Sequence, residues 1–164
     1  MIVRKQEPSE YRNTINWLNN KSIQRNFGFT REIILEEHVD WLQKRANIEV
    51  LSILYCNLHV GNIVLDFNER HESVFLQIYI GDSSCRGKGI GGVAMNIVLK
   101  YIFEEKQKNR LHLKVFEDNV PAIALYEKLG FIKEGIERES HKMDGVFRNQ
   151  LLYSMLSREW KGES

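Results

Sequence analysis

Cysteine and proline are scarce in this 164-residue chain, and several common catalytic motifs are missing. The two cysteines, Cys56 and Cys85, stand apart, with no CxxC pair and no Cys/His cluster at zinc spacing. HExxH and GxSxG are absent, which argues against a zinc protease and a serine hydrolase. Isolated cysteines favour a reducing compartment, so we expect a cytoplasmic protein without a bound metal.

Long apolar runs and an excess of one charge are absent as well. No run approaches the roughly 20 residues that a membrane span needs, and residues 1–13 lack the apolar stretch of a signal peptide. Lys and Arg number 23 against 22 Asp and Glu, which gives a net charge of +1. Because so small a charge attracts polyanions weakly, neither nucleic acid nor a membrane is expected as a partner.

The composition indicates one globular domain over residues 1–164. Hydrophobic residues make up 43% of the chain and charged residues 27%, an ordinary balance for a globular protein. The only prolines are Pro8 and Pro121, and no linker, repeat or low-complexity segment interrupts the sequence. A chain of this length suits a single core.

Hydrophobic periodicity predicts an α+β fold with a central, mixed and mostly antiparallel sheet and helices on its faces. We expect one early helix with Ser9 as its N-cap, and another that is capped by Thr30 and buries Ile33 and Ile34. Strands are predicted at 2–6, 50–56, 60–67, 74–80, 111–116, 131–137 and 148–156, and helices after residue 92 and at 121–129.

A glycine-rich loop follows the strand that ends at Ile80. Residues 79–92 read YIGDSSCRGKGIGG, so a strand ends, a turn follows and a helix begins. Unpaired amide groups and the helix dipole at such a turn favour a phosphate or pyrophosphate. Glycine lets the backbone approach the anion closely, and Arg86 and Lys88 add positive charge.

This loop alone admits two other interpretations. Gly87, Gly89 and Gly92 satisfy the GxGxxG pattern of a dinucleotide site. That reading expects an early strand-helix-strand unit in a parallel sheet, whereas a hairpin is predicted before this loop. A glycine turn without any ligand is the second alternative.

Two segments together resemble the GNAT superfamily of N-acetyltransferases. Arg86, Gly89 and Gly91 fill its motif A pattern, (Q/R)xxGx(G/A), and residues 119–131, NVPAIALYEKLGF, look like its NxxAxxxYxxxGF segment. The resemblance covers residues 51–160 and implies the acyl-CoA N-acyltransferase fold, with acetyl-coenzyme A (acetyl-CoA) as acyl donor and an amine as acceptor. It assigns cofactor contacts to Tyr79, Ile80, Gly81, Arg86, Gly87, Lys88, Gly89, Ile90, Gly91, Gly92, Asn119 and Tyr126.

Asn119 and Tyr126 are the candidates for chemistry in the second segment. Seven residues separate them, close to two helical turns, so both can face one groove. A tyrosine hydroxyl can protonate a leaving thiolate, and the resemblance implies this role for Tyr126 after direct attack of the amine on the thioester. Asn119 can bind a ligand amide or cap the helix, and Tyr126 can instead be a core aromatic.

The residue that removes the amine proton is left open by the sequence. The resemblance implies that the strands before and after the loop helix splay apart, helped by a bulge, so that pantetheine can enter. Many relatives carry a carboxylate on the strand before motif A, where this chain has Phe75. His71, Glu72, Asp82 or a chain of waters are the alternatives.

The N-terminal third is expected to form the acceptor pocket. Its pattern of WxN at residues 17–19, Arg25 and EEHxxW at residues 36–41 resembles nucleotide-amino-sugar N-acetyltransferases. The nearest of these acetylate the 4-amino group of a UDP-linked deoxy sugar in the pseudaminic acid pathway. The chain also resembles the RimJ/RimL-type branch of the superfamily. A tryptophan can stack on a uracil or sugar face and an arginine can meet a phosphate. Leu18 departs from the arginine that relatives often have. The resemblance assigns acceptor contacts to Trp17, Asn19, Arg25, His38 and Trp41.

Three classes of function therefore stay open. The acceptor is an amino sugar, or it is a protein N-terminus or polyamine, or the chain is a non-catalytic acyl-CoA sensor. A polyamine site needs clustered carboxylates, of which Glu32, Glu36, Glu37 and Asp40 form a weak version. The phenylalanine at position 75, where relatives carry a carboxylate, is compatible with a sensor, because a sensor needs no group that removes a proton from an amine. We expect acetyl-CoA and a small-molecule amine as partners, and a monomer or homodimer.

Overall fold

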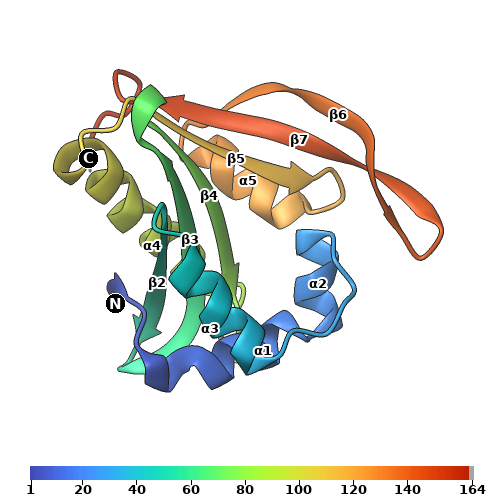
Figure 1. Ribbon diagram of the computed structural model, residues 1–164. Coiled ribbons are helices and arrows are strands. Elements are labelled where there is room, and N and C mark those ends of the chain that lie inside the picture. Colours follow the sequence, from blue (N-terminus) through green and yellow to red (C-terminus); the bar gives the residue numbers. More distant parts are fainter. Residues whose placement is uncertain (163–164) are drawn as a thin grey trace.

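Seven strands form one sheet in the order β1-β2-β3-β4-β5-β7-β6 (Figure 1). The structure, a computed structural model, describes residues 1–162. Every neighbouring pair of strands is antiparallel except β4 and β5, so the expected mixed and mostly antiparallel sheet is confirmed. The strands are β1 Ile2–Lys5, β2 Ile48–Tyr55, β3 Leu58–Asn68, β4 Ser73–Ile80, β5 Arg110–Phe116, β6 Ile132–Met143 and β7 Val146–Leu156.

Helices cover both faces of this sheet (Figure 1). They are α1 Tyr11–Leu18, α2 Lys21–Phe27, α3 Leu35–Lys44, α4 Ile90–Lys100 and α5 Val120–Lys128. Side chains alternate along a strand: Val74 and Leu76 of β4 join the core with α4 and α5, whereas Tyr79 contacts Trp17 and Phe27 on the opposite face. The helices α1–α3 therefore lie on one face, and α4 and α5 on the other.

Two predicted helix caps are wrong. Ser9 lies inside a 3-10 turn that Pro8 begins, and the Glu10 carboxylate closes that turn by accepting from the Glu7 amide at 2.8 Å. Thr30 lies well before α3, which starts only at Leu35.

The Asn19 side chain explains the late start of α3. Its amide group donates to the Ile33 carbonyl at 2.8 Å, and its carbonyl oxygen accepts from the Ile33 amide at 2.8 Å. Ile33 is thus tied to the end of α1, and Ile34 stays extended. The expected burial of Ile33 and Ile34 within a helix is therefore wrong, and Ile34 is 48% exposed.

The helix α2 was not predicted, although its boundary signals are in the sequence. The Asn20 side chain accepts from the Ser22 amide at 2.9 Å, as an N-cap does. Gly28 ends the helix in the left-handed conformation with φ of 75°. This short helix carries Phe27 to the edge of the gap between β4 and β5.

The strands β4 and β5 pair only at their first residues. Ser73–Phe75 lie beside Arg110–His112 in parallel register, and beyond that point no pairing between the two strands continues within residues 1–162. The predicted splay is therefore present. The predicted bulge is not, because β4 pairs with β3 without a register shift from Ser73 to Ile80.

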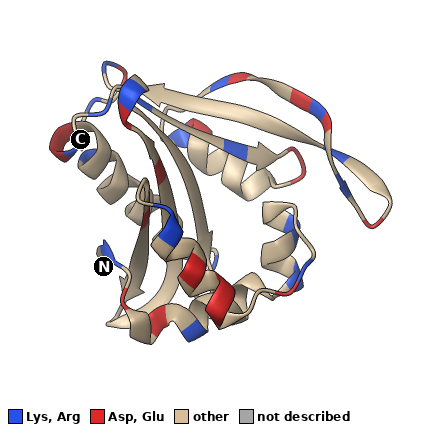
Figure 2. Cartoon of the chain, viewed as in Figure 1, with Lys and Arg blue, Asp and Glu red and all other residues tan. Residues whose placement is uncertain are grey.

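Tight turns close the two long hairpins. Cys56 and Asn57 join β2 to β3 with φ of 50° and 63°, and Asp144 and Gly145 join β6 to β7 with φ of 50° and 81°. Both turns have the positive φ pairs of the two-residue hairpins that suit strand twist. Residues of both charge signs are scattered along the chain (Figure 2). Within the described residues, no helix has both the length and the apolarity of a membrane span.

Candidate active site

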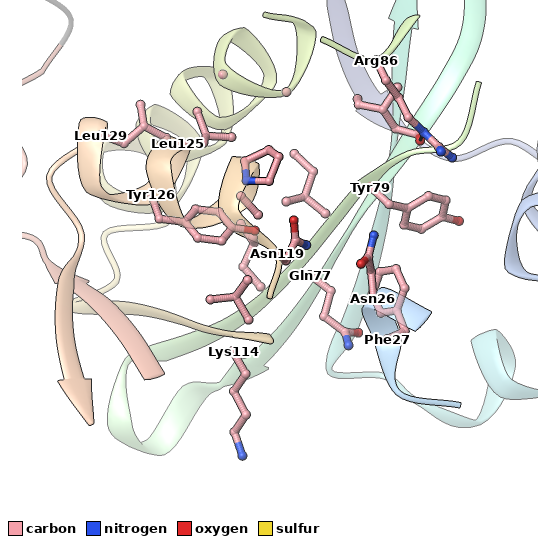
Figure 3. A pocket seen from close by; sticks show the side chains of 18 of the residues that line it. Asn26, Phe27, Gln77, Tyr79, Arg86, Lys114, Asn119, Leu125, Tyr126 and Leu129 are labelled. Carbon is pink, nitrogen blue, oxygen red and sulfur yellow. Dashed lines mark hydrogen bonds between the residues drawn. The ribbon is translucent and has the colours of Figure 1, made fainter. Parts of the chain in front are cut away.

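A cavity of about 1220 Å³ opens where β4 and β5 separate (Figure 3). One wall consists of the glycine-rich loop and α5, including Gly89, Leu125 and Tyr126. The opposite wall includes Phe27 of α2 and Gln77 of β4. Because the two walls belong to opposite faces of the sheet, the cavity runs through the gap and can admit two reactants from opposite sides.

The glycine-rich loop presents free amides to this cavity. None of the amides of residues 87–91 donates to a backbone acceptor within residues 1–162. Gly89 is the N-cap of α4 and adopts the left-handed conformation, with φ of 75°. Gly87, Gly89, Gly91 and Gly92 line the cavity, whereas the Ile90 side chain is buried in the core and Lys88 is exposed outside the lining. Unpaired amides at the start of a helix favour an anion such as a phosphate.

Arg86 lines the cavity but turns away from the loop amides (Figure 3). Its Nε donates to the Ile80 carbonyl at 2.9 Å, and one terminal nitrogen donates to the Gly81 carbonyl at 3.2 Å. The other terminal nitrogen reaches Ser22 Oγ at 3.3 Å. Arg86 therefore fastens the end of β4 to the start of α2, and its positive charge faces carbonyl groups instead of a carboxylate.

The end of β4 supplies a free strand edge. Tyr79 and Ile80 line the cavity, and Gly81 is buried with its amide donating to the Val60 carbonyl at 2.9 Å. Beyond Phe75, the side of β4 that faces β5 has lost its strand partner. Every second residue there directs its backbone polar groups into the gap, where a pantetheine amide can pair with them.

Tyr126 and Asn119 both face the cavity (Figure 3). Tyr126 is 6% exposed, and burial raises the pKa of its phenol to about 12, so the hydroxyl keeps its proton throughout the physiological range. Asn119 is the N-cap residue of α5, but its side chain makes no capping hydrogen bond. The capping alternative for Asn119 is therefore wrong, and its amide is available to a ligand.

The five predicted acceptor residues fall into two groups. Trp17, Asn19 and Arg25 line neither this cavity nor a second, smaller cavity that adjoins it. The Trp17 ring packs on Gly81, where an added Cβ would lie 1.9 Å from the indole, and against His59. Arg25 pairs with Asp118 at 3.1 Å on the surface. Trp17 and Asn19 thus hold the N-terminal helices in place.

His38 and Trp41 line a second cavity of about 310 Å³ between α1–α3 and the sheet. It shares Phe27, Gln77 and Tyr79 with the first, so the two adjoin. His38 is 6% exposed, and its Nε2 has no hydrogen-bond partner within residues 1–162. Burial lowers the pKa of His38, so the imidazole is neutral near pH 7. The remaining lining residues are Thr14, Leu18, Phe29, Arg31, Ile33, Glu37, Val50 and Val64.

None of the three side chains considered for proton removal lies in either cavity. His71 and Glu72 occupy the exposed turn before β4, at the opposite end of that strand from Ile80. Asp82 accepts from the Ser84 amide at 2.9 Å and caps a 3-10 turn. Within the described part of the chain, the lining of the first cavity contains no carboxylate, and its histidines are His112 and His141. Sequence reasoning missed both, although the polar residues of β5 alternate with buried Leu111 and Leu113.

Comparisons with known proteins agree with this geometry. Residues 35–131 match the model of the Acetyltransferase (GNAT) family. A Bacillus subtilis (strain 168) protein named "Putative ribosomal N-acetyltransferase YdaF" is 36% identical over 127 residues, covering 76% of this chain and 69% of the relative. "Uncharacterized N-acetyltransferase p20" of Bacillus licheniformis is 36% identical over 76 residues. That match covers 46% of this chain and 43% of the relative, so the chain spans less than half of it.

A solved structure shows the same fold over nearly the whole chain. The spermidine N-acetyltransferase of Vibrio cholerae, crystallised with CoA and spermine, superimposes with a TM-score of 0.90 at 23% sequence identity and covers 96% of each chain. The single parallel strand pair and these matches rule out the dinucleotide interpretation of GxGxxG. The chain belongs to the acetyltransferase (GNAT) family, and the fold, the enzyme class of acetyl-CoA-dependent N-acetyltransferase and the acetyl-CoA donor expected from the sequence are thereby confirmed.

Proposed function

We propose that this chain transfers the acetyl group of acetyl-CoA to the primary amine of a nucleotide-linked amino sugar, such as the 4-amino group of a UDP-linked deoxy sugar. The observation that carries this proposal is the second cavity. It is lined mostly by apolar side chains, among them Phe27, Phe29 and Trp41, and it meets the first cavity at Gln77 and Tyr79.

The size and lining of the second cavity suit a compact ring. Its volume lies within the usual range of small-molecule sites, which are mostly apolar with a few polar groups that set orientation. Phe27, Phe29 and Trp41 offer faces on which the apolar side of a sugar ring can pack. The neutral imidazole of His38 can exchange a hydrogen bond with a sugar hydroxyl.

The charges around the two cavities disfavour a polyamine acceptor. A polycation needs carboxylates, and none of those in residues 1–162 lines the first cavity. Of the carboxylates that the structure describes, Glu37 alone lines the second cavity, and it pairs with Arg31 at 2.8 Å. The other carboxylates of the acidic cluster seen in the sequence line neither cavity; they are Glu32, Glu36 and Asp40. A neutral or anionic molecule that carries one amine is better accommodated.

The same arrangement supports direct transfer. The thioester is expected in the gap between β4 and β5, beside the Tyr126 hydroxyl, with its diphosphate on the amides of residues 87–91. The amine reaches it from the α1–α3 face past Gln77. Holding both reactants in one cavity supplies much of the rate gain, and Tyr126 assists the departing sulfur.

A panel of acceptors tests this proposal. Thiol release from acetyl-CoA is measured with UDP-linked amino sugars, free amino sugars, polyamines and peptides. We expect the highest kcat/KM with a UDP-linked amino sugar. A higher value for spermidine would contradict the assignment, and so would the absence of thiol release with every amino sugar of the panel.

A protein N-terminus is the second candidate, favoured by the relative YdaF, which is named as a ribosomal N-acetyltransferase and is 36% identical over 127 residues. A peptide would need the open side of the first cavity near His141 and Gln150 on the β6–β7 hairpin. Preference for an N-terminal peptide over every amino sugar in the panel would select this candidate.

Replacing Trp41 with Leu tests the second cavity directly. We expect the acceptor KM to rise roughly 5- to 10-fold, because the loss of an aromatic face costs about 1 kcal/mol. The affinity for acetyl-CoA should not change. Trp160→Leu is the matched control, because Trp160 packs on Phe103 and lines neither cavity. Equal acceptor KM values for the two variants would remove Trp41 from the acceptor site.

A further inference from the structure

The amine of the acceptor must lose a proton before it can attack, and among residues 1–162 no carboxylate lines the first cavity to take it. Its lysines and arginine are cations, and its phenols are protonated. Only the histidines of the lining can accept a proton near neutral pH. We propose that His112 of β5 removes the proton from the acceptor amine, an inference that rests on the proposed acetyl transfer.

The position of His112 supports this role. It lies opposite Phe75 in the last paired register of β4 and β5, at the point where the two strands part. The two rings are 5.3 Å apart, so Phe75 packs against the imidazole and fixes its place. Strand alternation puts His112, Phe75 and Gln77 on the same face, the one from which the acceptor arrives. Leu111 and Leu113 point to the core on the other side.

The surroundings keep the imidazole neutral. Partial burial is the main cause that lowers the pKa of His112, and the positive charges of Arg110 and Lys114 on β5 lower it further. Glu134 of β6 and Asp66 of β3 act in the opposite direction and do not reverse the shift. Glu134 is itself engaged by Arg110 through two hydrogen bonds of 2.6 Å. The nitrogen lone pair is therefore free at neutral pH.

His141 is the other histidine of this cavity, and its place suits the role less. It lies on β6 beside Phe116, at a ring separation of 5.2 Å, and close to Gly28 at the end of α2. Its Nδ1 lies 3.2 Å from Ser140 Oγ. It is thus near the end of β5, away from the point where β4 and β5 part.

The proton balance of the reaction is complete with these groups. The ammonium gives one proton to a ring nitrogen of His112, which passes it to solvent. The amine lone pair then forms the C–N bond, the C–S bond breaks, and the electron pair leaves with sulfur. The Tyr126 hydroxyl donates a hydrogen bond to the departing sulfur. The second N–H gives its proton to solvent, and solvent returns one proton to the thiolate. The products are the amide, the free thiol and one released proton.

The pH dependence of kcat/KM tests His112. The 164-residue chain is assayed by thiol release with acetyl-CoA and the best acceptor of the panel, as wild type, His112→Gln and His71→Gln. His71 is the matched control, because it lies on the exposed turn before β4 and lines neither cavity. Glutamine is neutral and cannot accept the proton. We expect His112→Gln to lose roughly 100-fold near pH 7, the usual contribution of a general base. The loss should shrink toward pH 9, where the amine deprotonates in solution. His71→Gln should follow the wild-type profile.

The outcomes separate this inference from the proposed function. Calorimetry with CoA shows whether each variant keeps its donor site. Wild-type rates for His112→Gln at every pH would overturn the role of His112 and leave the acetyl transfer standing. An equal loss at all pH values would also overturn it, because a packing defect does not depend on amine ionisation. Absence of turnover in the wild type with every amine would contradict the proposed function itself.

Discussion

Replacing Gly89 with Asp is expected to abolish the binding of coenzyme A. The amides of residues 87–91 have no backbone acceptors within the described chain, so they can converge on a diphosphate. A Cβ at residue 89 would meet nothing within 4 Å, and the new carboxylate would therefore stand in open space beside those amides. It would compete for the donors and repel the anion.

The matched control for this variant is Gly89→Asn. Residue 89 adopts φ of 75°, a left-handed conformation that Asp and Asn both tolerate better than other side chains. The two variants therefore share most of the backbone strain and differ in charge. Calorimetry should show that Asp weakens CoA binding at least about 100-fold, or roughly 2.8 kcal/mol, and that Asn weakens it much less. An Asp variant that keeps wild-type affinity would contradict the assignment of the loop.

The donor half of the site could be predicted because its signals are local. A glycine that must be left-handed, a helix that starts after it and Asn119 before Pro121 each constrain a few neighbouring residues. Local conformation then fixes the amides without knowledge of distant segments. The splay of β4 and β5 came from family resemblance instead, and its predicted cause was wrong, because β4 has no bulge along β3.

The acceptor half could not be predicted to the same degree, because it depends on how α1–α3 pack. Trp17 and Trp41 are equivalent in sequence as possible stacking residues. Only the fold shows that the Trp17 ring packs on Gly81, whereas Trp41 lines a cavity. Phe27 was missed for a related reason: α2 was not predicted, although Asn20 and Gly28 mark its ends.

His112 illustrates the same limit in a strand. Alternation predicts that His112 and Lys114 share one face of β5, but not which strand lies beside them. The parallel register with Phe75 brings the imidazole to the splay point. Because Phe75 stands where relatives carry a carboxylate, the sequence suggests substitutes close to the same strand, namely His71, Glu72 and Asp82. His112 lies on the neighbouring strand and faces the same space.

Replacing Tyr126 with Phe is expected to lower kcat about 100-fold while leaving the affinity for acetyl-CoA unchanged. The ring is held by Phe131 and Tyr153, at centroid distances of 5.8 and 6.4 Å, and phenylalanine preserves that packing. Only the hydroxyl that faces the cavity is lost. Tyr153→Phe is the control: its pKa is also raised to about 12, but its hydroxyl donates to Glu127 at 2.8 Å and its side chain does not line the cavity.

The pKa of Tyr126 decides which size of effect to expect. The pKa of Tyr126, about 12, lies well above the pKa of a thiol, about 8.5. Proton transfer from the phenol to a free thiolate is therefore thermodynamically unfavourable. The hydroxyl therefore acts mainly by donating a hydrogen bond to sulfur as the C–S bond breaks, and the loss should fall at the lower end for acid catalysis. The wild-type rate should show no decline from ionisation of Tyr126 below about pH 10. A Phe variant with wild-type kcat across that range would show that Tyr126 only packs against Phe131 and Tyr153.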